Sequence, residues 1–323
     1  MRLLITGITG FVGSHLSEFL RAKGYEVFGT THSGKLLSSK KVKIFNCDMR
    51  DSLRIREILS DTKPQQIYHL SAVSFPPDSI ENPRMTYDVN FYGTINLLEA
   101  VKEAGLKSEI LFVGSSDEYG VIFKRYMPIT EDCLLNPVTP YAASKASADI
   151  VCYSYARTYN MNIVRVRPFN HTGPGQRAEF VCSGFAKQIV EIEAKIREPV
   201  IYTGNREIQR DFTDVRDIVS AYYLALKKGA SDEVYNICSG NTYSIQWILN
   251  TLLKSAGLSV EIREDKSKLR HGDVKVIKGD CSKFRAITGW KSTIPFEKTL
   301  SDLLDYWREK VSNRHSSFVT RHS

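Results

Sequence analysis

The stretch GITGFVG, residues 7–13, decides the fold of this chain. It follows a short apolar run over 2–6 and opens a segment with helical spacing over 11–23. Gly7 permits a tight turn, Gly10 lets the backbone approach a ligand closely, and Gly13 lets helix and strand pack together. The helix N-terminus presents backbone N–H groups and a positive dipole end to phosphates. This order of strand, glycine turn and helix predicts a dinucleotide-binding turn; the alternative interpretation is a tight turn without a ligand.

Strand-like and helix-like segments continue to alternate after this turn. Strands are expected over 26–30, 42–46, 66–70, 110–113 and 162–167, and helices over 52–61, 85–104 and 141–159. The alternation predicts a parallel sheet with helices on both faces. The expected fold class is α/β, a Rossmann-type doubly wound parallel sheet with a smaller C-terminal α/β substrate lobe.

The order of these segments also predicts the division into domains. We expect a dinucleotide-binding domain over residues 1–168, with a later segment of about 205–240 returning to it. An interleaved substrate lobe is expected over 169–310. The last residues, 311–323, are polar and lack periodicity, so we expect a flexible tail there.

The composition narrows the class of partner. With 323 residues, 42% of them hydrophobic and 25% charged, the chain can bury a real core and is neither disordered nor fibrous. Its net charge of +8 indicates an anionic partner. The basic segment over 262–285 has one aromatic residue, Phe284, and no zinc-ligand spacing, so we expect a small anion and no nucleic acid.

Two further features bear on compartment and cofactors. The chain has no run of about 18 apolar residues, so neither a membrane-spanning helix nor a membrane partner is expected. Its six cysteines are scattered without a C-x-x-C pair, which predicts reduced thiols, no metal site and a cytoplasmic protein.

The end of the second strand bears on the choice of nicotinamide cofactor. NAD sites usually place an acid on the adenosine ribose about 20 residues after the glycines. Residues 30–35 contain no acid, and Lys35, Lys40 and Lys41 lie near. We therefore favour NADP(H), with NAD(H) as the alternative. Asp48, after the third strand, is a candidate acceptor for the adenine amino group or, alternatively, an acid at a helix N-terminus.

A tyrosine and a lysine stand four residues apart in the helix over 141–159. Tyr141 and Lys145 therefore lie on one helix face, and an ammonium beside a phenol is expected to lower the pKa of the phenol. Tyr141 would then exchange a proton with a substrate oxygen. The preceding strand ends in GSSDEYG, residues 114–120, at the edge where parallel sheets bind ligands. A serine hydroxyl there is a candidate to hydrogen-bond the same oxygen.

These motifs resemble the extended short-chain dehydrogenase/reductase family that modifies nucleotide sugars. The resemblance extends to about Tyr306 and includes HLSA over 69–72 and DVNFYGT over 88–94. It implies that Ser116, or alternatively its neighbour Ser115, is the catalytic hydroxyl, and that the protein is a homodimer formed through two long helices. The cofactor-binding residues that it implies are Gly7, Gly10, Phe11, Val12, Gly13, Thr31, Asp48, Met49, Leu70, Ser71, Ala72, Asn90, Tyr141, Lys145, Pro168 and Asn170.

The second half of the sequence is similar to the branch of the family that acts on GDP-sugars. RPFNHTGPGQ over 167–176, GFAKQIV over 184–190 and RDFTDVRD over 210–217 carry this likeness. The family's late Arg-Pro-x-Glu motif appears as RHGD over 270–273, with an aspartate in place of the glutamate. The likeness implies that two cations, Lys187 and Arg210, face the substrate diphosphate. The substrate-binding residues that it implies are Ser116, Asp117, Asn170, Val181, Lys187, Arg210, Arg270 and Asp273.

The resemblance implies reduction of the C4 keto group of GDP-4-keto-6-deoxy-D-mannose to GDP-D-rhamnose. In that reaction Tyr141 donates the proton, Lys145 lowers the Tyr141 pKa and holds the nicotinamide ribose, and the serine fixes the keto oxygen. The alternative is a GDP-mannose 4,6-dehydratase, because Asp117 and a catalytic Glu118 are the paired carboxylates that its proton transfers need. The strand end is one residue shorter than the usual dehydratase form. A nucleotide-sugar 4-epimerase and a non-catalytic dinucleotide-binding protein are further alternatives.

Overall fold

The computed structural model describes residues 1–319 except 33, 35–41, 123 and 267–273. The chain divides into two compact units. The first comprises Met1–Phe169, Arg216–Cys238 and Gly279–Lys291. The second comprises Asn170–Val215, Ser239–Lys278 and the segment from Ser292 onward. Each unit is described by itself below.

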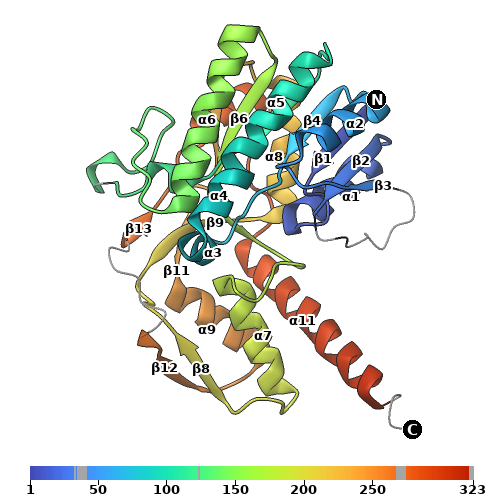
Figure 1. Cartoon of the computed structure of the whole chain (residues 1–323). Coiled ribbons are helices and arrows are strands. Elements are labelled where there is room, and N and C mark those ends of the chain that lie inside the picture. The colour runs from blue at the N-terminus through green and yellow to red at the C-terminus, as the bar shows by residue number, and fades with distance from the viewer. Residues whose placement is uncertain (33, 35–41, 123, 267–273, 320–323) are drawn as a thin grey trace. The chain divides into compact units, whose positions relative to one another are not determined.

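The first unit is built on a parallel sheet of seven strands (Figure 1). They are β1 (Arg2–Thr6), β2 (Glu26–Thr31), β3 (Lys43–Asn46), β4 (Gln66–His69), β5 (Glu109–Val113), β6 (Ile163–Pro168) and β10 (Val234–Ile237). The strand order is β10-β6-β5-β4-β1-β2-β3. The chain therefore reverses its winding between β1 and β4, where doubly wound sheets bind ligands at the carboxyl ends of the strands.

Helices cover both faces of this sheet, as predicted. They are α1 (Phe11–Ala22), α2 (Ser52–Thr62), α3 (Pro76–Glu81), α4 (Pro83–Tyr87), α5 (Gly93–Glu103), α6 (Pro140–Tyr159), α8 (Val215–Lys228) and α10 (Ser282–Thr288). The apolar faces of α2, α5 and α6 form one buried cluster with strand residues such as Leu4 and Ile110. Across the sheet, α1 and α8 meet through the rings of Phe19 and Tyr223. The expected Rossmann-type α/β fold is confirmed.

The helix expected over 85–104 is interrupted by a π-helical turn, η1 (Asp88–Tyr92), between α4 and α5. Turns of this kind are rare, and those that occur are frequently at functional sites. Two 3₁₀ turns, η2 (Ser116–Tyr119) and η3 (Lys124–Tyr126), follow β5. The η2 turn carries the acidic residues of the GSSDEYG stretch.

The second unit has its own sheets and its own core. Its strands are β7 (Asn170–Thr172), β8 (Val200–Thr203), β9 (Gln209–Asp214), β11 (Thr242–Ser244), β12 (Glu261–Glu264) and β13 (Val276–Ile277). In the sheets, β9 pairs with β7, β11 and β13, and β8 pairs with β12. Its helices α7 (Val181–Glu193), α9 (Ile245–Ala256) and α11 (Phe296–Val319) pack around buried residues such as Ile189, Leu249 and Leu300.

Two segments differ from the expected division. Residues 279–291 belong to the first unit in addition to 216–238, which lies inside the expected return of 205–240. This second return is held by buried rings, because Phe284 of α10 packs against Tyr235 of β10 and against Trp290. The segment expected to be a tail from 311 is helical to Val319, and Val311 is buried in the core of the second unit.

Three observations complete the fold. None of the helices in the described part of the chain is long and apolar enough to span a membrane. The described residues include no group of three or more His, Cys, Asp or Glu side chains placed to hold a metal ion. None of the six cysteines forms a disulfide, and five of them are buried.

Candidate active site

The glycine turn at the end of β1 has the shape of a phosphate cradle. Gly7 has a φ of +71°, and the Gly10 N–H donates to the Gly7 carbonyl at 3.0 Å. A Cβ at Gly13 would overlap the Gly7 carbonyl oxygen and lie 2.8 Å from the Ile8 Cα, so strand and helix meet only with glycine there. Gly10 is the N-cap of α1, and no side chain caps the first turn. Because the backbone is bare and the helix N-terminus is uncapped, the turn fits the diphosphate of a dinucleotide.

Thr31 and Asp48 lie where β2 and β3 end. The Thr31 hydroxyl hydrogen-bonds the Thr9 hydroxyl at 2.8 Å. Asp48 accepts from the Arg50 guanidinium at 2.6 Å and from the Arg50 backbone N–H at 2.9 Å, and Arg50 lowers the Asp48 pKa. The N-terminal acid of α2 is instead Asp51, whose side chain accepts from the backbone N–H of Arg54. Lys35, Lys40 and Lys41 lie outside the described residues.

Met49 lies beside Asp48 and is buried. Its backbone carbonyl accepts from the Asn96 side chain at 2.9 Å. A Cβ at Gly93 would lie 2.8 Å from the Met49 Cβ, so the start of α5 packs closely on this residue. The backbone after β3 is therefore fixed by α5.

The end of β4 is joined to β1 through a threonine. The Thr6 hydroxyl accepts from the backbone N–H groups of Leu70 and Ser71, each at 3.1 Å. With both lone pairs used, this hydroxyl donates to His69 Nδ1 at 2.8 Å, which places the His69 proton on Nε2, 3.0 Å from the Thr94 hydroxyl. Burial lowers the His69 pKa to about 3, so His69 is neutral. These bonds fix Leu70, Ser71 and Ala72, which follow β4, beside the glycine turn. The two segments are close, because a Cβ at Gly7 would lie 3.1 Å from the Ser71 backbone.

Asn90 lies in the π-helical turn and is buried. Its side-chain oxygen accepts from the Val73 N–H at 2.8 Å. Its side-chain nitrogen donates to the Val73 carbonyl at 3.1 Å and to the Ser144 hydroxyl at 2.9 Å. Asn90 was expected to bind cofactor. The structure shows it joining the segment after β4 to Ser144 of α6, the residue before Lys145 in the chain.

Tyr141 and Lys145 both lie in the first turns of α6, as the spacing predicted. The helix begins after Thr139, whose hydroxyl accepts from the Ala142 N–H at 3.1 Å, and Pro140 occupies the first turn. The Tyr141 backbone N–H donates to the Ser79 hydroxyl at 3.1 Å. The first turn of α6 is therefore anchored to α3.

The electrostatics of this pair differ from the expectation. The Lys145 ammonium donates to the Val113 carbonyl at 2.7 Å, and burial lowers the Lys145 pKa to about 8. The Tyr141 pKa is raised, first by burial and then by the Asp117 carboxylate. The predicted lowering by Lys145 is not seen, because the ammonium is directed to the Val113 carbonyl. Tyr141 is thus held as a neutral phenol.

Ser115 is the serine whose side chain influences Tyr141. It follows Gly114 at the carboxyl end of β5, and its hydroxyl is close enough to the Tyr141 phenol to lower the pKa of that phenol. Its backbone is extended, with φ −158° and ψ 147°. Ser116 begins the η2 turn and is buried. Of the two serines that the sequence left open, the structure therefore brings Ser115 to Tyr141.

The two acids of the η2 turn have different environments. Asp117 is exposed and close enough to raise the Tyr141 pKa. Glu118 is fully buried, its Oε1 accepts from the Ser115 N–H at 2.7 Å, and its Oε2 lies 3.1 Å from Arg167 Nε. Burial and the neighbouring Asp149 raise the Glu118 pKa. Glu118, which the sequence offers as a catalytic acid, is directed into the protein interior.

The other residues expected from the sequence to bind the cofactor do not all belong to the same unit. Pro168 is the last residue of β6 and lies opposite Ile237 of β10 in the first unit. Asn170 begins β7 in the second unit and is exposed. Phe11 and Val12 form the first turn of α1.

The expected substrate residues of the second unit lie on two elements. Val181 begins α7 and is exposed, and Lys187 lies two turns further along the same helix. Arg210 lies on β9, where its guanidinium donates to the carbonyls of Gln209 at 2.9 Å and Val274 at 2.8 Å. Arg270 and Asp273 lie outside the described residues.

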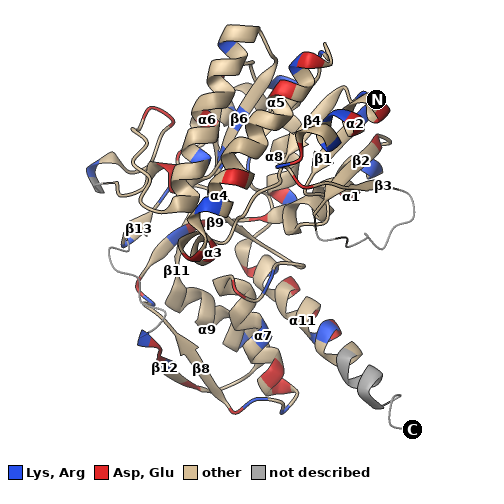
Figure 2. Cartoon of the chain, in the orientation of Figure 1, with Lys and Arg blue, Asp and Glu red and all other residues tan. Residues whose placement is uncertain are grey.

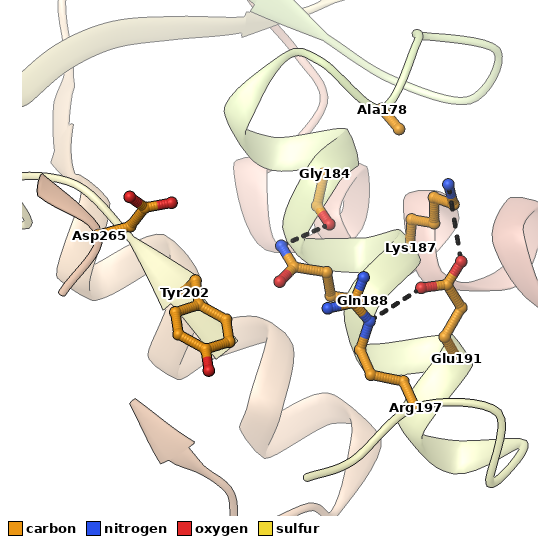
Figure 3. Close-up of a pocket in the computed structure, with 8 residues that line it drawn as sticks. All are labelled: Ala178, Gly184, Lys187, Gln188, Glu191, Arg197, Tyr202 and Asp265. Atoms are coloured by element: carbon orange, nitrogen blue, oxygen red, sulfur yellow. Dashed lines mark hydrogen bonds and ion pairs between the residues drawn. The ribbon is translucent and has the colours of Figure 1, made fainter. Parts of the chain in front are cut away.

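Lys187 lines a hollow of about 340 Å³ in the second unit (Figure 3). Glu191 lies between two cations there, 3.6 Å from Lys187 and 3.0 Å from Arg197. Tyr202 of β8 and Asp265 also line it. The motifs of the sequence did not single out Arg197, Tyr202 or Asp265, because their spacing along the chain has no pattern and only the fold gathers them. The hollow therefore combines two cations, an aromatic ring and carboxylates.

Known proteins resemble this chain along nearly its whole length. The family model described as GDP-mannose 4,6 dehydratase matches residues 4–303. A GDP-6-deoxy-D-mannose reductase of Pseudomonas aeruginosa is 31% identical, over 96% of this chain and 98% of that protein. GDP-mannose 4,6 dehydratase 2 of Arabidopsis thaliana is 30% identical, over 94% and 85%.

Solved structures of similar proteins also match this chain along nearly its whole length. The structure of RMD from Pseudomonas aeruginosa complexed with NADPH superposes with a TM-score of 0.85 at 30% identity, covering 96% of this chain and 99% of that chain. A Thermus thermophilus UDP-glucose 4-epimerase in complex with NAD gives a TM-score of 0.85 at 27% identity, covering 95% and 99%. The glycine turn, the Tyr141 and Lys145 pair and these likenesses agree: this chain belongs to the GDP-mannose 4,6 dehydratase family of extended short-chain dehydrogenases/reductases and is an NAD(P)-dependent enzyme of that type.

Proposed function

We propose that the protein reduces the C4 keto group of GDP-4-keto-6-deoxy-D-mannose, giving GDP-D-rhamnose. The observation that carries the proposal is a buried Tyr141 phenol, neutral and influenced by the Ser115 side chain, while Glu118 is fully buried. Reduction of a ketone needs one proton donor, and a phenol whose pKa is raised keeps its proton until a stronger base arises. The similarity to a GDP-6-deoxy-D-mannose reductase supports the same reaction.

In this reaction each group of the site has a separate role. A bound nicotinamide supplies the hydride to C4. The Ser115 hydroxyl orients the keto oxygen, and Tyr141 gives its proton to the oxygen as negative charge develops there. The Lys145 pKa of about 8 lies near neutral pH, so this amine can both release a proton and take one up while Tyr141 is being reprotonated. The glycine turn of residues 7–13 holds the cofactor diphosphate.

The second candidate is the dehydratase reaction on GDP-mannose. A GDP-mannose 4,6 dehydratase of Arabidopsis thaliana is 30% identical to the chain, and Asp117 is an exposed carboxylate close enough to raise the Tyr141 pKa. Removal of water across C5–C6 needs an acid and a base. The burial of Glu118 against Arg167 leaves Asp117 as the accessible member of the pair in the η2 turn, which favours the reductase.

Two assays separate the candidates. The enzyme is given GDP-mannose with NADP⁺, and separately GDP-4-keto-6-deoxy-D-mannose with NADPH. The reductase oxidises NADPH in proportion to the keto sugar consumed, and only in the second mixture. Formation of a keto sugar from GDP-mannose without net change in NADPH would establish the dehydratase instead.

We propose that NADP(H) is preferred over NAD(H). The end of β2 has no acid to repel a 2′-phosphate, and the charge of Asp48 is paired with Arg50. Equilibrium dissociation constants, measured by quenching of protein fluorescence with NADPH and with NADH, test the preference. Tighter binding of NADH would contradict it.

We propose that the hollow of the second unit binds the nucleotide of the GDP-sugar. Lys187 and Arg197 would meet phosphate oxygens, and the Tyr202 ring, 40% exposed, offers a face to a base. Substitution Tyr202→Ala should raise the KM for the GDP-sugar with little effect on NADPH affinity. An unchanged KM would remove Tyr202 from the site.

We propose a cytoplasmic homodimer. Tyr92 of η1 and Ile150 and Tyr153 of α6 are large apolar side chains that are 55%, 58% and 45% exposed. Solvent-exposed apolar residues of this size on two neighbouring helical segments suit an interface between copies. Light scattering at micromolar concentration should give twice the mass of the chain, and Ile150→Asp should give the single mass.

A further inference from the structure

Glu118 is a buried acid that the proposed proton transfer does not use, yet it touches the serine that does. Its Oε1 accepts from the Ser115 backbone N–H at 2.7 Å. The Ser115 hydroxyl oxygen in turn accepts from the Asp117 backbone N–H at 3.1 Å. These reciprocal bonds form a capping box at the start of the η2 turn. Ser115, whose hydroxyl meets Tyr141, is thus fixed at both its backbone and its side chain.

The residue before Ser115 shows how closely the Glu118 carboxylate fits. A Cβ at Gly114 would overlap Glu118 Oε1 and lie 3.2 Å from Glu118 Cδ. The same Cβ would lie 3.2 Å from the Val166 carbonyl oxygen, which is close but tolerable. Gly114 has no positive φ that would require glycine, so the space taken by the carboxylate accounts for the residue.

An ionic network surrounds the far side of the Glu118 carboxyl group, whose Oε2 forms no hydrogen bond with the described residues. Arg167 Nε lies 3.1 Å from Glu118 Oε2 and donates to Asp149 Oδ2 at 3.0 Å, and Arg165 binds the other oxygen of Asp149. Arg167 also donates to the Tyr119 hydroxyl at 3.0 Å. All four ionisable side chains of this network are buried. Because Glu118 is fully buried and its Oε1 is bonded to the Ser115 N–H, its side chain has little freedom to move.

We propose that Glu118 is a positioning residue: through the capping box it holds the Ser115 hydroxyl opposite the Tyr141 phenol, and Gly114 is glycine because that carboxylate occupies the space of a Cβ. The activity test of this inference rests on the proposed reductase function. Its spectroscopic test does not.

Two substitutions separate geometry from charge. Glu118→Gln keeps a side-chain oxygen that can accept from Ser115, whereas Glu118→Ala removes it. Since a displacement of about 1 Å costs up to about 100-fold in rate, Glu118→Ala should lower kcat by about 10- to 100-fold. The KM values for keto sugar and NADPH should stay within about twofold, and Glu118→Gln should recover kcat to within about fivefold of the wild type. Loss of kcat in both variants alike would overturn the capping role.

A double-mutant cycle with Gly114 tests the steric part. Gly114→Ala should lower kcat by about tenfold or more when Glu118 is present, because the new Cβ displaces the carboxylate. In the Glu118→Ala background the same change should cost less than about threefold, because the overlapping atom is gone. The contact of the new Cβ with the Val166 carbonyl oxygen is present with and without Glu118, so its effect on kcat cancels in the cycle. Losses that multiply would show that Gly114 and Glu118 act separately and would overturn the proposal.

The last readout needs no turnover. Protein labelled with 13Cζ-tyrosine gives one resonance per tyrosine, and Tyr141→Phe identifies that of Tyr141. Glu118→Ala and Gly114→Ala should each shift this resonance, whereas Glu118→Gln should leave it nearly in place. Thermal unfolding and NADPH affinity confirm that each variant is folded. If the wild type does not reduce the keto sugar, the proposed function fails while this measurement still decides. An unmoved Tyr141 resonance in folded Glu118→Ala or Gly114→Ala would overturn the positioning role.

Discussion

At the scale of single residues, the candidate site depends on which groups are buried and what they face. Tyr141 and Lys145 stand where their spacing predicted, but their proton affinities come from surroundings that the spacing does not describe. Burial keeps the phenol neutral and lowers the Lys145 pKa to about 8. A neutral phenol and an amine of moderate pKa in the first turns of one helix suit proton delivery at neutral pH.

Tyr141→Phe tests the proton donor directly. The change removes the hydroxyl and leaves the ring, so packing in α6 is retained. We expect kcat to fall by about 100- to 10,000-fold with NADPH affinity within about twofold. Stopped-flow reduction of the keto sugar and fluorescence titration with NADPH measure the two effects. Turnover close to that of the wild type would show that another group donates the proton.

His69 makes the stability of the protein depend on pH. Its folded pKa is about 3, below the value of about 6.5 in an unfolded chain. The unfolded state therefore binds more protons in acid, and the free energy of unfolding falls as the pH drops below about 6.5. His69→Gln should flatten this fall by up to about 1.4 kcal/mol per pH unit between about pH 4 and 6. Urea unfolding over this range measures it; equal slopes would contradict a neutral His69.

At the scale of elements, the β1–α1 turn and the π-helical turn carry the cofactor side of the site. The glycine turn sets how closely α1 approaches β1, and η1 directs the Asn90 side chain to Val73 and Ser144. Both devices act through backbone geometry. A regular α-helix through residues 88–92 would rotate Asn90 away from one of its partners, since each residue advances about 100° around a helix.

Substitutions at Gly13 and Gly10 should differ in their effects on the melting temperature and on NADPH affinity. Gly13→Ala places a Cβ against the Gly7 carbonyl and the Ile8 backbone, so it should lower the melting temperature and weaken NADPH binding. Gly10→Ala has a regular φ of −71° and meets the Gly7 carbonyl oxygen at a tolerable 3.2 Å. It should leave the melting temperature within about 2 °C but weaken NADPH about tenfold or more by blocking the diphosphate. Calorimetry and fluorescence titration distinguish the two; similar profiles for both variants would refute the assignment.

At the scale of the whole molecule, the net charge of +8 comes from residues distributed along the chain. Figure 2 shows Lys and Arg residues interspersed with Asp and Glu residues along the ribbon of both units. Many cations are paired locally, as Lys283 is with Glu233 at 2.7 Å. The anionic partner is therefore expected to meet a few cations, and Lys187 and Arg197, which share Glu191, line one of the hollows of the second unit.

Salt should reveal which cations matter. Because partly exposed charges are screened, the KM for the GDP-sugar should rise about three- to tenfold between about 0.05 and 0.5 M salt. Lys187→Met should raise the KM at low salt and flatten this dependence. Lys283→Met is the matched control, since it removes the same charge from the first unit and should leave both unchanged. A control that behaves like Lys187→Met would show that net charge alone acts.

The sequence by itself determined the fold and the reaction class, because both can be inferred from the spacing of residues that are close together along the chain. The glycine spacing, the strand–helix alternation and the i, i+4 pair of Tyr141 and Lys145 each involve neighbours along the chain. The tertiary structure alone decided that Ser115 meets Tyr141, that Glu118 is buried, and that Arg197, Tyr202 and Asp265 share one hollow. These facts depend on contacts between residues far apart in sequence, such as Glu118 with Arg167. Burial and pKa follow from such contacts, which no spacing along the chain records.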